Sequence, residues 1–286
     1  MSESEKESGE YELATFKLKG ARLHSFVKAV GAIADECRVI VNEKGWTTKQ
    51  VDPAHVAMIS VGIPKKDFDE WDAPFEHIDL DQIEIGLDLD ELNAYIKRCK
   101  FHEPKKGEPY SVSMLELVFM ANDVSTGEGD LKKTEPKVTK IVLRTYNGET
   151  TISPVDTESM SEPKVPSLKL PSKAVFAADE LGRFKAFLAN AKGITDYIML
   201  SNRAGERELM ASCESDRTKA NAKLQSGNGI MRESAKSLFP LDYLGNIVSA
   251  LPNMEIGLEI GNDYPMVLTC PGIDATYMLA PRIESD

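Results

Sequence analysis

Two sets of four apolar residues follow the repeat of an α-helix, at positions i, i+3, i+4 and i+7. They are Leu23, Phe26, Val27 and Val30 near the start of the chain, and Phe184, Phe187, Leu188 and Ala191 in its second half. This spacing gives a helix one apolar stripe that can lie on a sheet while the other side faces solvent. We therefore expect an amphipathic helix near the start of each half.

Short β-rich runs, bounded by turn signals, fill most of the chain between these helices. Asn147-Gly148 and Asn228-Gly229 are pairs typical of hairpin turns. The runs occupy residues 39–41, 56–61, 115–119, 140–144, 197–200, 254–260 and 265–268. Short strands joined by tight turns predict antiparallel sheets.

The pattern of helix and strands occurs twice along the chain. Residues 89–96 open a second helix, and residues 241–248 repeat its pattern in the second half. In the first of these helices the side expected on the sheet carries Leu89, Leu92, Ile96 and Cys99. Each half thus has the order strand, helix, strands, helix, strands. The predicted fold class is α+β with antiparallel sheets, built from an internal duplication.

Composition predicts where the two halves meet. Residues 151–171 contain four prolines and several serines, which favour an extended, exposed connector. We expect a first domain at 11–150 and a second at 172–286, preceded by a disordered acidic tail at 1–10. The polar residues 122–137 include two glycines and a proline, and they predict a long mobile loop.

The composition is that of a soluble globular protein. The 286 residues are 42% hydrophobic and 28% charged, and no run approaches the roughly 18 apolar residues that a membrane-spanning helix needs. The four cysteines lie far apart without a C-x-x-C pair, which argues against a zinc cluster or a disulfide framework. This use of cysteine suits a reducing cytoplasm.

No familiar catalytic signature is present. The sequence lacks G-x-S-x-G, G-x-x-x-x-G-K-[ST], H-E-x-x-H and the dinucleotide glycine pattern. Residues 226–229 are glycine-rich but lack the flanking residues of a phosphate-binding loop, so a hairpin turn is the better interpretation. A catalytic pocket made by convergent side chains stays open as an alternative. We expect no enzyme activity, no cofactor and no metal site.

Several segments, in order along the chain, resemble those of PCNA-type DNA sliding clamps. Residues 51–59 resemble the family's D-x-x-H-V strand, and residues 277–284 resemble its C-terminal L-A-P-[KR]-[IV]-E tail. The helix openings at 87–89 and 240–244 and the segment 262–266 stand in the corresponding places. The resemblance covers nearly the whole chain, and the connector is most similar to those of archaeal members.

The resemblance implies a ring that performs no chemistry. Three copies of the two-domain subunit would close into a homotrimer, with helices lining the central hole and sheets outside. Such a ring encircles double-stranded DNA and tethers DNA polymerase, the clamp loader, flap endonuclease and ligase during replication and repair. Two alternatives within the fold are a subunit that works only in a heterotrimer and a clamp-fold checkpoint protein. The implied location is the cytoplasm of an archaeal cell, or the nucleus in a eukaryote.

DNA contact has to come from a local basic surface, because the formal net charge of −12 alone points away from nucleic acid. By the resemblance, basic residues opposite the apolar stripes would face the DNA. These residues are Lys28, Lys97, Arg98, Lys100, Arg183, Lys185 and Lys192. The helix at 242–251 has no basic residue, and the plain alternative for the others is an ordinary solvated helix face.

The resemblance also implies an apolar pocket beside the connector that receives a PIP-box-type peptide of partner proteins. The residues at the matching positions are Val51, His55, Val56, Val165, Pro166, Leu168, Pro265, Ala280, Pro281 and Ile283. Taken singly, each of these residues is also explained as plain core, and His55 as a buried histidine with satisfied hydrogen bonds.

A third implied site joins neighbouring subunits, edge strand to edge strand. By position in the family pattern, residues 150–153 of one subunit would meet residues 207–213 of the next. The residues expected in this contact are Thr150, Thr151, Ile152, Ser153, Glu208, Leu209, Met210, Ala211 and Ser212.

Overall fold

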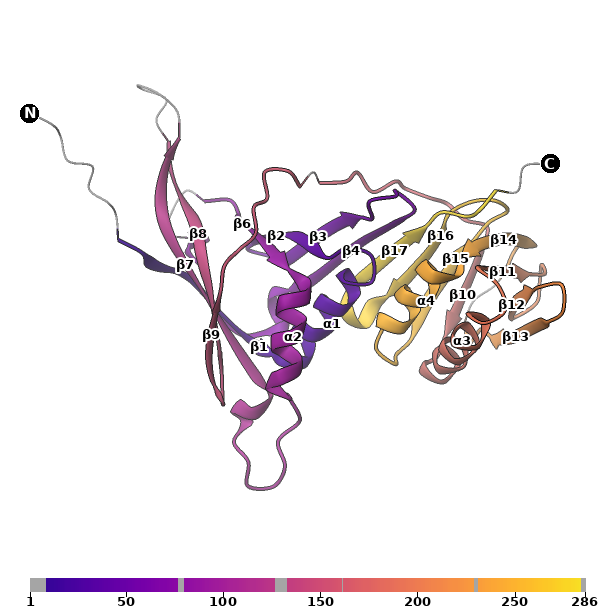
Figure 1. The fold of residues 1–286 in the computed structure, drawn as a ribbon, viewed down its shortest axis with the longest axis horizontal. Coiled ribbons are helices and arrows are strands. Elements are labelled where there is room, and N and C mark those ends of the chain that lie inside the picture. Colours follow the sequence, from indigo (N-terminus) through magenta and orange to yellow (C-terminus); the bar gives the residue numbers. More distant parts are fainter. Residues whose placement is uncertain (1–8, 77–79, 127–132, 161, 229–230, 284–286) are drawn as a thin grey trace, which may run out of the picture. The chain divides into compact units, whose positions relative to one another are not determined.

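The computed structural model describes residues 9–76, 80–126, 133–160, 162–228 and 231–283. Most of the tail predicted at 1–10, and Gly229 of one predicted turn, lie outside the described residues. The chain divides into two compact units (Figure 1). The N-terminal unit holds Met1–His24, Arg38–Thr47 and Ile63–Met160, and the C-terminal unit holds Ser25–Cys37, Thr48–Gly62 and Ser161–Asp286. The predicted domain boundaries at 11–150, 151–171 and 172–286 stay a prediction.

The larger sheet of the N-terminal unit has five antiparallel strands in the order β5-β1-β7-β8-β9. Their bounds are β1 Tyr11–Lys19, β5 Phe68–Asp72, β7 Met114–Thr126, β8 Lys133–Thr145 and β9 Gly148–Ile152. Successive side chains of a strand point to opposite faces, so Phe16 and Leu18 of β1 are buried while Lys17 reaches solvent. The strands β5 and β9 lie at the two edges of this sheet.

Helix α2 (Leu89–Cys99) follows strand β6 (Ile83–Asp88), and it contacts this sheet through the Tyr95 hydroxyl, which donates to the Leu143 carbonyl of β8 at 3.2 Å. It begins at Asp88, whose carboxylate accepts a hydrogen bond from the Glu91 N–H at 2.8 Å, as an N-cap does. The predicted apolar side was right for Leu89, Leu92 and Ile96, which are buried. It was wrong at its end, because Cys99 is only half-buried and Tyr95 is buried instead.

An aromatic cluster forms the core of the N-terminal unit. Phe16 lies at the centre, with ring centroids of Trp46, Phe68, Trp71 and Phe119 at 4.7 to 5.8 Å. Trp46 enters from a hairpin of β2 (Glu36–Asn42) and β3 (Gly45–Val51), in which Ile40 pairs with Thr47. Edge-to-face pairs of this kind each contribute about 0.5–1.5 kcal/mol beyond burial, so the cluster ties this hairpin to the sheet.

Residues 122–137 are mostly strand, so the prediction of a long mobile loop was wrong for their described part. The β7–β8 ladder continues through Asn122↔Lys137 as far as Thr126↔Lys133. The side chains of Asp123, Val124 and Ser125 are exposed on this extension, which explains the polar sequence. The backbone ladder holds the extension, and a hydrogen bond of 2.6 Å from the Tyr11 hydroxyl to Asp123 Oδ1 supports it from β1.

The C-terminal unit contains two groups of antiparallel strands. In the first, β10, β15, β16, β17 and β4 are neighbours in that order, and the second is a four-stranded sheet in the order β13-β12-β11-β14. The bounds of the first group are β4 Ala57–Pro64, β10 Ser172–Phe176, β15 Ile256–Ile260, β16 Met266–Cys270 and β17 Ala275–Leu279. Those of the second are β11 Tyr197–Asn202, β12 Glu208–Glu214, β13 Lys219–Gln225 and β14 Ala235–Pro240.

Three further helices carry their apolar sides against these sheets. They are α1 (Gly20–Val30), α3 (Ala178–Ala191) and α4 (Leu241–Ala250), and α3 packs beside α4 (Figure 1). The stripe predicted for α1 is buried throughout, and in α3 only Phe187 departs from it by remaining half-buried. The Tyr277 hydroxyl of β17 donates to the Ala29 carbonyl of α1 at 2.7 Å, which fixes α1 over β17.

Short 3₁₀ turns complete the described elements, at Lys65–Asp67, Pro74–Glu76, Tyr110–Ser113 and Pro271–Ile273. The α+β class with antiparallel sheets and two helices in each repeat is therefore confirmed. Among the helices of the described residues, none is long and apolar enough to cross a membrane.

Candidate functional site

The last turn of α2 carries a group of exposed cations. Lys97, Arg98 and Lys100 are exposed, on the side opposite the buried Leu89 and Leu92. Lys100 ends the helix in the left-handed conformation, with φ of 52°. None of the three forms an ion pair with another described residue. Cations at a helix C-terminus are favoured by the helix dipole, and these remain available to an outside anion.

The basic residues of α3 differ from one another in their surroundings. Arg183 donates to Glu180 Oε1 at 2.7 Å and to the Lys223 carbonyl at 3.2 Å, so its charge is balanced within the protein. Lys192 is exposed, and its side chain passes beside Gly245 of α4.

Lys185 closes the end of α4. Its Nζ donates to the Leu251 carbonyl at 2.6 Å and to Asn253 Oδ1 at 3.0 Å. Burial lowers the pKa of Lys185, and the positive charge of Lys28 lowers it further. Of the seven predicted cations, Arg183 and Lys185 thus have structural partners, although Arg183 is itself exposed, whereas the other five are exposed and form no ion pair with another described residue. The exposed five, Lys28, Lys97, Arg98, Lys100 and Lys192, are the better candidates for binding an anion.

The segment 51–57 is organised by one buried carboxylate, Asp52, which the sequence did not single out as functional. Asp52 Oδ1 accepts from the backbone N–H groups of Val56 at 2.6 Å and Ala57 at 2.5 Å. Its Oδ2 accepts from the Ala54 N–H at 2.9 Å and from the Tyr243 hydroxyl at 2.6 Å. Burial alone would raise the pKa of Asp52, but these hydrogen bonds outweigh it and hold the pKa below its usual value.

His55 stands out from this segment with its side chain exposed and a φ of 57°. The alternative of a buried histidine is therefore excluded. The left-handed conformation is uncommon for a residue other than glycine, and the Asp52 hydrogen bonds on either side of His55 maintain it. The loop presents His55 to solvent between the half-buried Val51 and Val56.

An apolar patch lies on the outward face of β4, β17 and β16. Met58 pairs with Met278 across β4 and β17, and Met278 pairs with Val267 across β17 and β16. All three are half-buried, while their neighbours in each strand are buried on the other face. Val56 and Ala280 join at one end, where the Ala280 N–H donates to the Val56 carbonyl at 2.8 Å. We define the apolar patch as Val56, Met58, Pro265, Val267, Met278 and Ala280.

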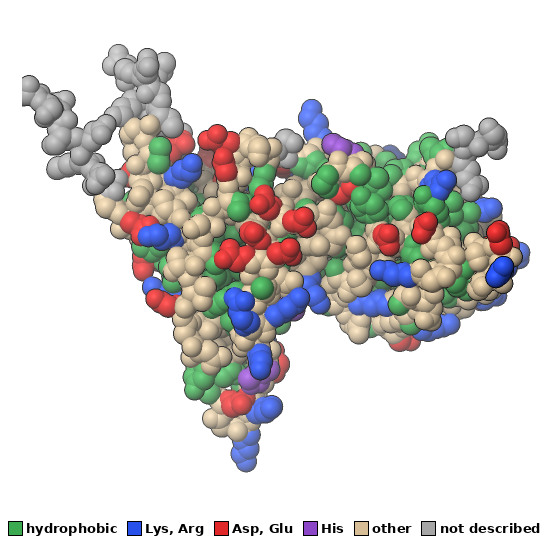
Figure 2. Space-filling model, in the orientation of Figure 1, with side chains coloured by type: hydrophobic (Ala, Val, Ile, Leu, Met, Phe, Trp, Pro, Cys, Tyr) green, Lys and Arg blue, Asp and Glu red, His purple; other side chains and the backbone are tan. Residues whose placement is uncertain are grey.

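The apolar patch therefore contains three of the residues predicted for the pocket and three that the sequence analysis did not predict. Val56, Pro265 and Ala280 belong to the patch, whereas Met58, Val267 and Met278 were missed. Alternation within β4 and β17 could have revealed the two methionines, since they share a face with Val56 and Ala280. Figure 2 shows hydrophobic side chains grouped on the surface of the C-terminal unit over β16 and β17.

Two segments with exposed apolar side chains accompany the patch in the C-terminal unit. Ile283 is 70% exposed although the tail before it is anchored by Arg282, whose N–H donates to the Leu238 carbonyl at 2.7 Å. The Arg282 guanidinium also stacks 4.2 Å from the Tyr197 ring centroid. In the connector, Val165 is 40% exposed, Pro166 is exposed and Leu168 is half-buried. Single exposed apolar residues such as these are common on any protein, so it is the contiguous apolar patch that is typical of a protein-binding surface.

The edges of the two outer sheets revise the predicted subunit contact. Strand β9, with Thr150, Thr151 and Ile152, is an edge strand and its backbone is open on one side. Strand β12, with Glu208 to Ser212, pairs on both sides, with β11 and with β13. It cannot receive another strand, so residues 208–212 are not the pairing edge that the sequence led us to expect. The open edge of this sheet is β13.

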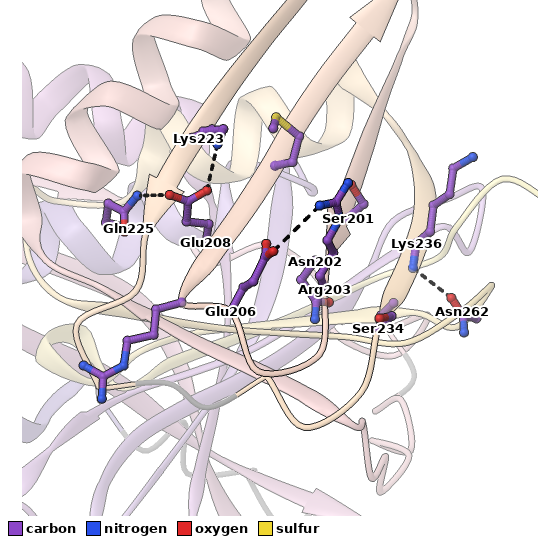
Figure 3. Close-up of a pocket in the computed structure, with 13 residues that line it drawn as sticks. Ser201, Asn202, Arg203, Glu206, Glu208, Lys223, Gln225, Ser234, Lys236 and Asn262 are labelled. Carbon is purple, nitrogen blue, oxygen red and sulfur yellow. Dashed lines mark hydrogen bonds and ion pairs between the residues drawn. The ribbon is translucent and has the colours of Figure 1, made fainter.

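A polar hollow of about 1000 Å³ lies beside β12 and β13 (Figure 3). Glu208 points across it, and accepts from Lys223 Nζ at 3.0 Å and from Gln225 Nε2 at 2.9 Å. These contacts brace β12 against the edge strand β13. Glu206 and Arg203 pair at 3.8 Å in the adjoining turn. Within the described residues, no group of three or more His, Cys, Asp and Glu side chains could hold a metal ion.

Comparison with known proteins finds relatives that match more than nine-tenths of the chain. No protein-family model matches the sequence. The curated DNA polymerase sliding clamp of Methanococcoides burtonii is 28% identical over 270 residues, which is 92% of this chain and 96% of that protein. The DNA polymerase sliding clamp of Archaeoglobus fulgidus is 29% identical over 279 residues, which is 94% of this chain and 98% of that protein.

Solved structures show the same architecture. The complex of A. fulgidus PCNA with the C-terminal region of FEN-1 matches with a TM-score of 0.73 and 25% identity, over 96% of this chain and 100% of that one. PCNA from Entamoeba histolytica matches with a TM-score of 0.71 over 96% of this chain and 100% of that one. Its 14% identity shows a shared fold alone.

Proposed function

We propose that this chain, whose sequence and fold place it with the PCNA-type DNA sliding clamps, forms a homotrimeric ring around duplex DNA and tethers replication and repair proteins to it. The observation that carries the proposal is a match to archaeal clamps over more than nine-tenths of the chain in both sequence and fold. The protein acts as a binding scaffold and not as an enzyme. Its place of action is the cytoplasm of an archaeal cell.

Weak attraction to phosphate, independent of base sequence, lets such a ring slide. Lys97, Arg98 and Lys100 suit this role, because they are exposed and have no ion-pair partner among the described residues. Contacts to phosphate position a protein on DNA but carry no sequence information. Retention then comes from closure of the ring, so a chain with a net charge of −12 needs only a local basic surface.

Ring closure joins the open edge of β9 in one subunit to the open edge of β13 in the next. Both are edge strands of antiparallel sheets. Pairing them satisfies the free backbone N–H and C=O groups of both edges and removes two sites of aggregation. A contact between two different edges repeats head to tail, which closes a ring when the rotation allows it. This assignment keeps Thr150 to Ile152 from the sequence prediction and replaces residues 208–212 by Lys219–Gln225.

Partner proteins dock on the apolar patch with a short PIP-box-type peptide. The A. fulgidus clamp, which this chain resembles, is bound by the C-terminal region of FEN-1. His55, Val165 and Ile283 are exposed in the same unit as the patch and supply contacts around it. DNA polymerase, the clamp loader, flap endonuclease and ligase are the proposed partners.

The mass of the purified full-length chain in solution tests the ring. Light scattering across a range of protein and salt concentrations should give a species of three times 31.6 kDa, because each subunit offers one β9 edge and one β13 edge to its neighbours in the proposed ring. A monomer at every concentration would contradict the homotrimer. A ring that forms only when a second clamp chain is co-expressed would instead establish the heterotrimer alternative.

A further inference from the structure

The end of α2 and the loop that follows it concentrate positive charge in a strongly acidic chain. Residues 97–110 contain five Lys and Arg side chains against two glutamates, while the whole chain has a net charge of −12. Lys97 and Arg98 belong to the last turn of α2, Lys100 caps that helix, and the other two cations are Lys105 and Lys106. We call residues 100–109 the basic finger. In Figure 2, Lys and Arg side chains continue to the lower tip of the N-terminal unit, where this loop lies in Figure 1.

The base of the finger is anchored to the N-terminal unit. The ring of Phe101 packs so closely on Gly20, the first residue of α1, that a Cβ at that glycine would lie 2.3 Å from the ring. Lys19 Nζ binds Glu103 Oε1 at 2.9 Å, which ties the finger to the end of β1. One of the two glutamates is therefore neutralised by a residue outside the finger. The anchored base gives the charged tip a defined direction.

The second glutamate of the finger, Glu108, contacts other residues of the same loop. Glu108 accepts from the Lys105 N–H at 2.9 Å and contacts His102 Nε2 at 3.0 Å. The Lys100 carbonyl, 3.1 Å from His102 Nδ1, and the Glu108 carboxylate both raise the pKa of His102. Gly107, with φ of 91°, closes the turn in which the Glu108 N–H donates to the Lys105 carbonyl at 3.0 Å.

Lys105 and Lys106 reach solvent at the tip, where hydrogen bonds from the Lys105 N–H and His102 lower the pKa of Glu108 and the nearby charge of Lys105 lowers it further. Both are exposed, and neither forms an ion pair with another described residue. They follow Lys97, Arg98 and Lys100 in the sequence, and Figure 2 shows Lys and Arg side chains in a strip that runs to the lower tip of the N-terminal unit. The lysine ammonium is a strongly hydrated point charge on a flexible side chain. Such a group can exchange one phosphate of the DNA backbone for the next without a fixed geometry.

We propose that the basic finger is a second phosphate-binding contact on duplex DNA, beyond the helix α2. The inference rests on the proposed function, since it takes the last turn of α2 as the start of the DNA-contacting strip. Duplex DNA fits the strip because its phosphates form a continuous row of negative charge. The finger adds to the attraction between the protein and DNA without adding any preference for base sequence.

The Lys105→Gln/Lys106→Gln double variant of the full-length protein tests the finger. Its affinity for a fluorescent linear duplex is measured by anisotropy between about 50 and 200 mM salt. Removing two phosphate contacts should lower the slope of log affinity against log salt by about 1.8. Over that salt range the wild-type protein should then lose about 12-fold more affinity than the variant. The Lys164→Gln/Lys169→Gln variant removes the same charge from exposed connector positions, and should match wild type.

The outcomes separate this inference from the proposed function. A variant that binds DNA with wild-type affinity and slope, while the wild-type trimer binds normally, would overturn the finger and leave the clamp intact. A wild-type chain that neither forms a trimer nor binds duplex DNA would overturn the clamp itself. Equal losses in the finger variant and the connector control would attribute the effect to net charge, and would also overturn the finger.

Discussion

The Asp52→Ala variant is expected to lose about 2–4 kcal/mol of unfolding free energy and most of its affinity for a partner peptide. Asp52 is 2% exposed as a residue, and its carboxylate accepts four hydrogen bonds, three from backbone N–H groups and one from Tyr243. Alanine would leave the buried Ala57 N–H and the Tyr243 hydroxyl without this acceptor. The left-handed conformation of His55 would then lose its support, and the loop beside the apolar patch would change shape.

Urea unfolding and binding of a peptide from the C-terminal region of A. fulgidus FEN-1 measure the two effects. Tyr243→Phe is the matched control, because it removes one of the four hydrogen bonds and should cost about 1 kcal/mol. Asp52→Asn keeps an acceptor oxygen and should fall between the two. An Asp52→Ala protein with wild-type stability and affinity would show that the carboxylate does not organise this segment.

Acid should weaken the same contacts. Because hydrogen bonding holds the pKa of Asp52 below its unfolded value of about 3.9, its contribution to stability is complete above that pH and is lost as the pH falls through the folded pKa. Part of the acid sensitivity of the wild-type protein should therefore be absent from Asp52→Asn.

The Met278→Asp variant should bind the same peptide at least about 30-fold more weakly, which corresponds to the 2 kcal/mol or more of a central interface residue. Met278 lies between Met58 and Val267 on the outward face, so a carboxylate there would sit in the middle of the apolar patch. The fold should tolerate the change because the side chain is only half-buried. The circular dichroism spectrum and the solution mass should stay those of the wild-type protein.

Thr276→Asp is a matched control for this variant. Thr276 lies two residues earlier on the same face of β17, where it pairs with Ser60 and Thr269 outside the patch. It introduces the same charge, and should change peptide affinity by less than about two-fold. Equal losses in both variants would mean that charge on this face, and not the apolar patch, governs binding.

Hydrophobic periodicity predicted the elements of this fold well because most of its helices are amphipathic. All four stripe residues of α1 are buried, and the α2 stripe failed only where Tyr95 replaces Cys99. Tyrosine combines a ring that can be buried with a hydroxyl that needs a partner, and a local pattern could not reveal that this partner is the Leu143 carbonyl at 3.2 Å. Its burial depends on a strand 48 residues away in the sequence.

The site residues were harder to predict because their surroundings are set by the tertiary structure. The alternation of β12 predicts a strand, but only the order of the sheet decides that β13 and not β12 is its edge. Lys185 lies on a helix like Lys192, yet it is held by the end of α4 while Lys192 remains exposed. The segments that resemble the sliding-clamp family located Val56 and Ala280, and strand pairing was needed to add Met58 and Met278.

Retention on a linear duplex with blocked ends tests encirclement of DNA most directly. The protein is mixed with a duplex biotinylated at both ends, and streptavidin is added either after the protein or before it. When streptavidin is added after the protein, a ring that has threaded onto the DNA should stay bound after dilution, because the blocked ends retain it. When streptavidin is added first, the ring cannot thread, and its weak contacts with phosphate should be lost on dilution. Equal, rapid loss in both orders, or equal retention in both, would contradict a sliding ring.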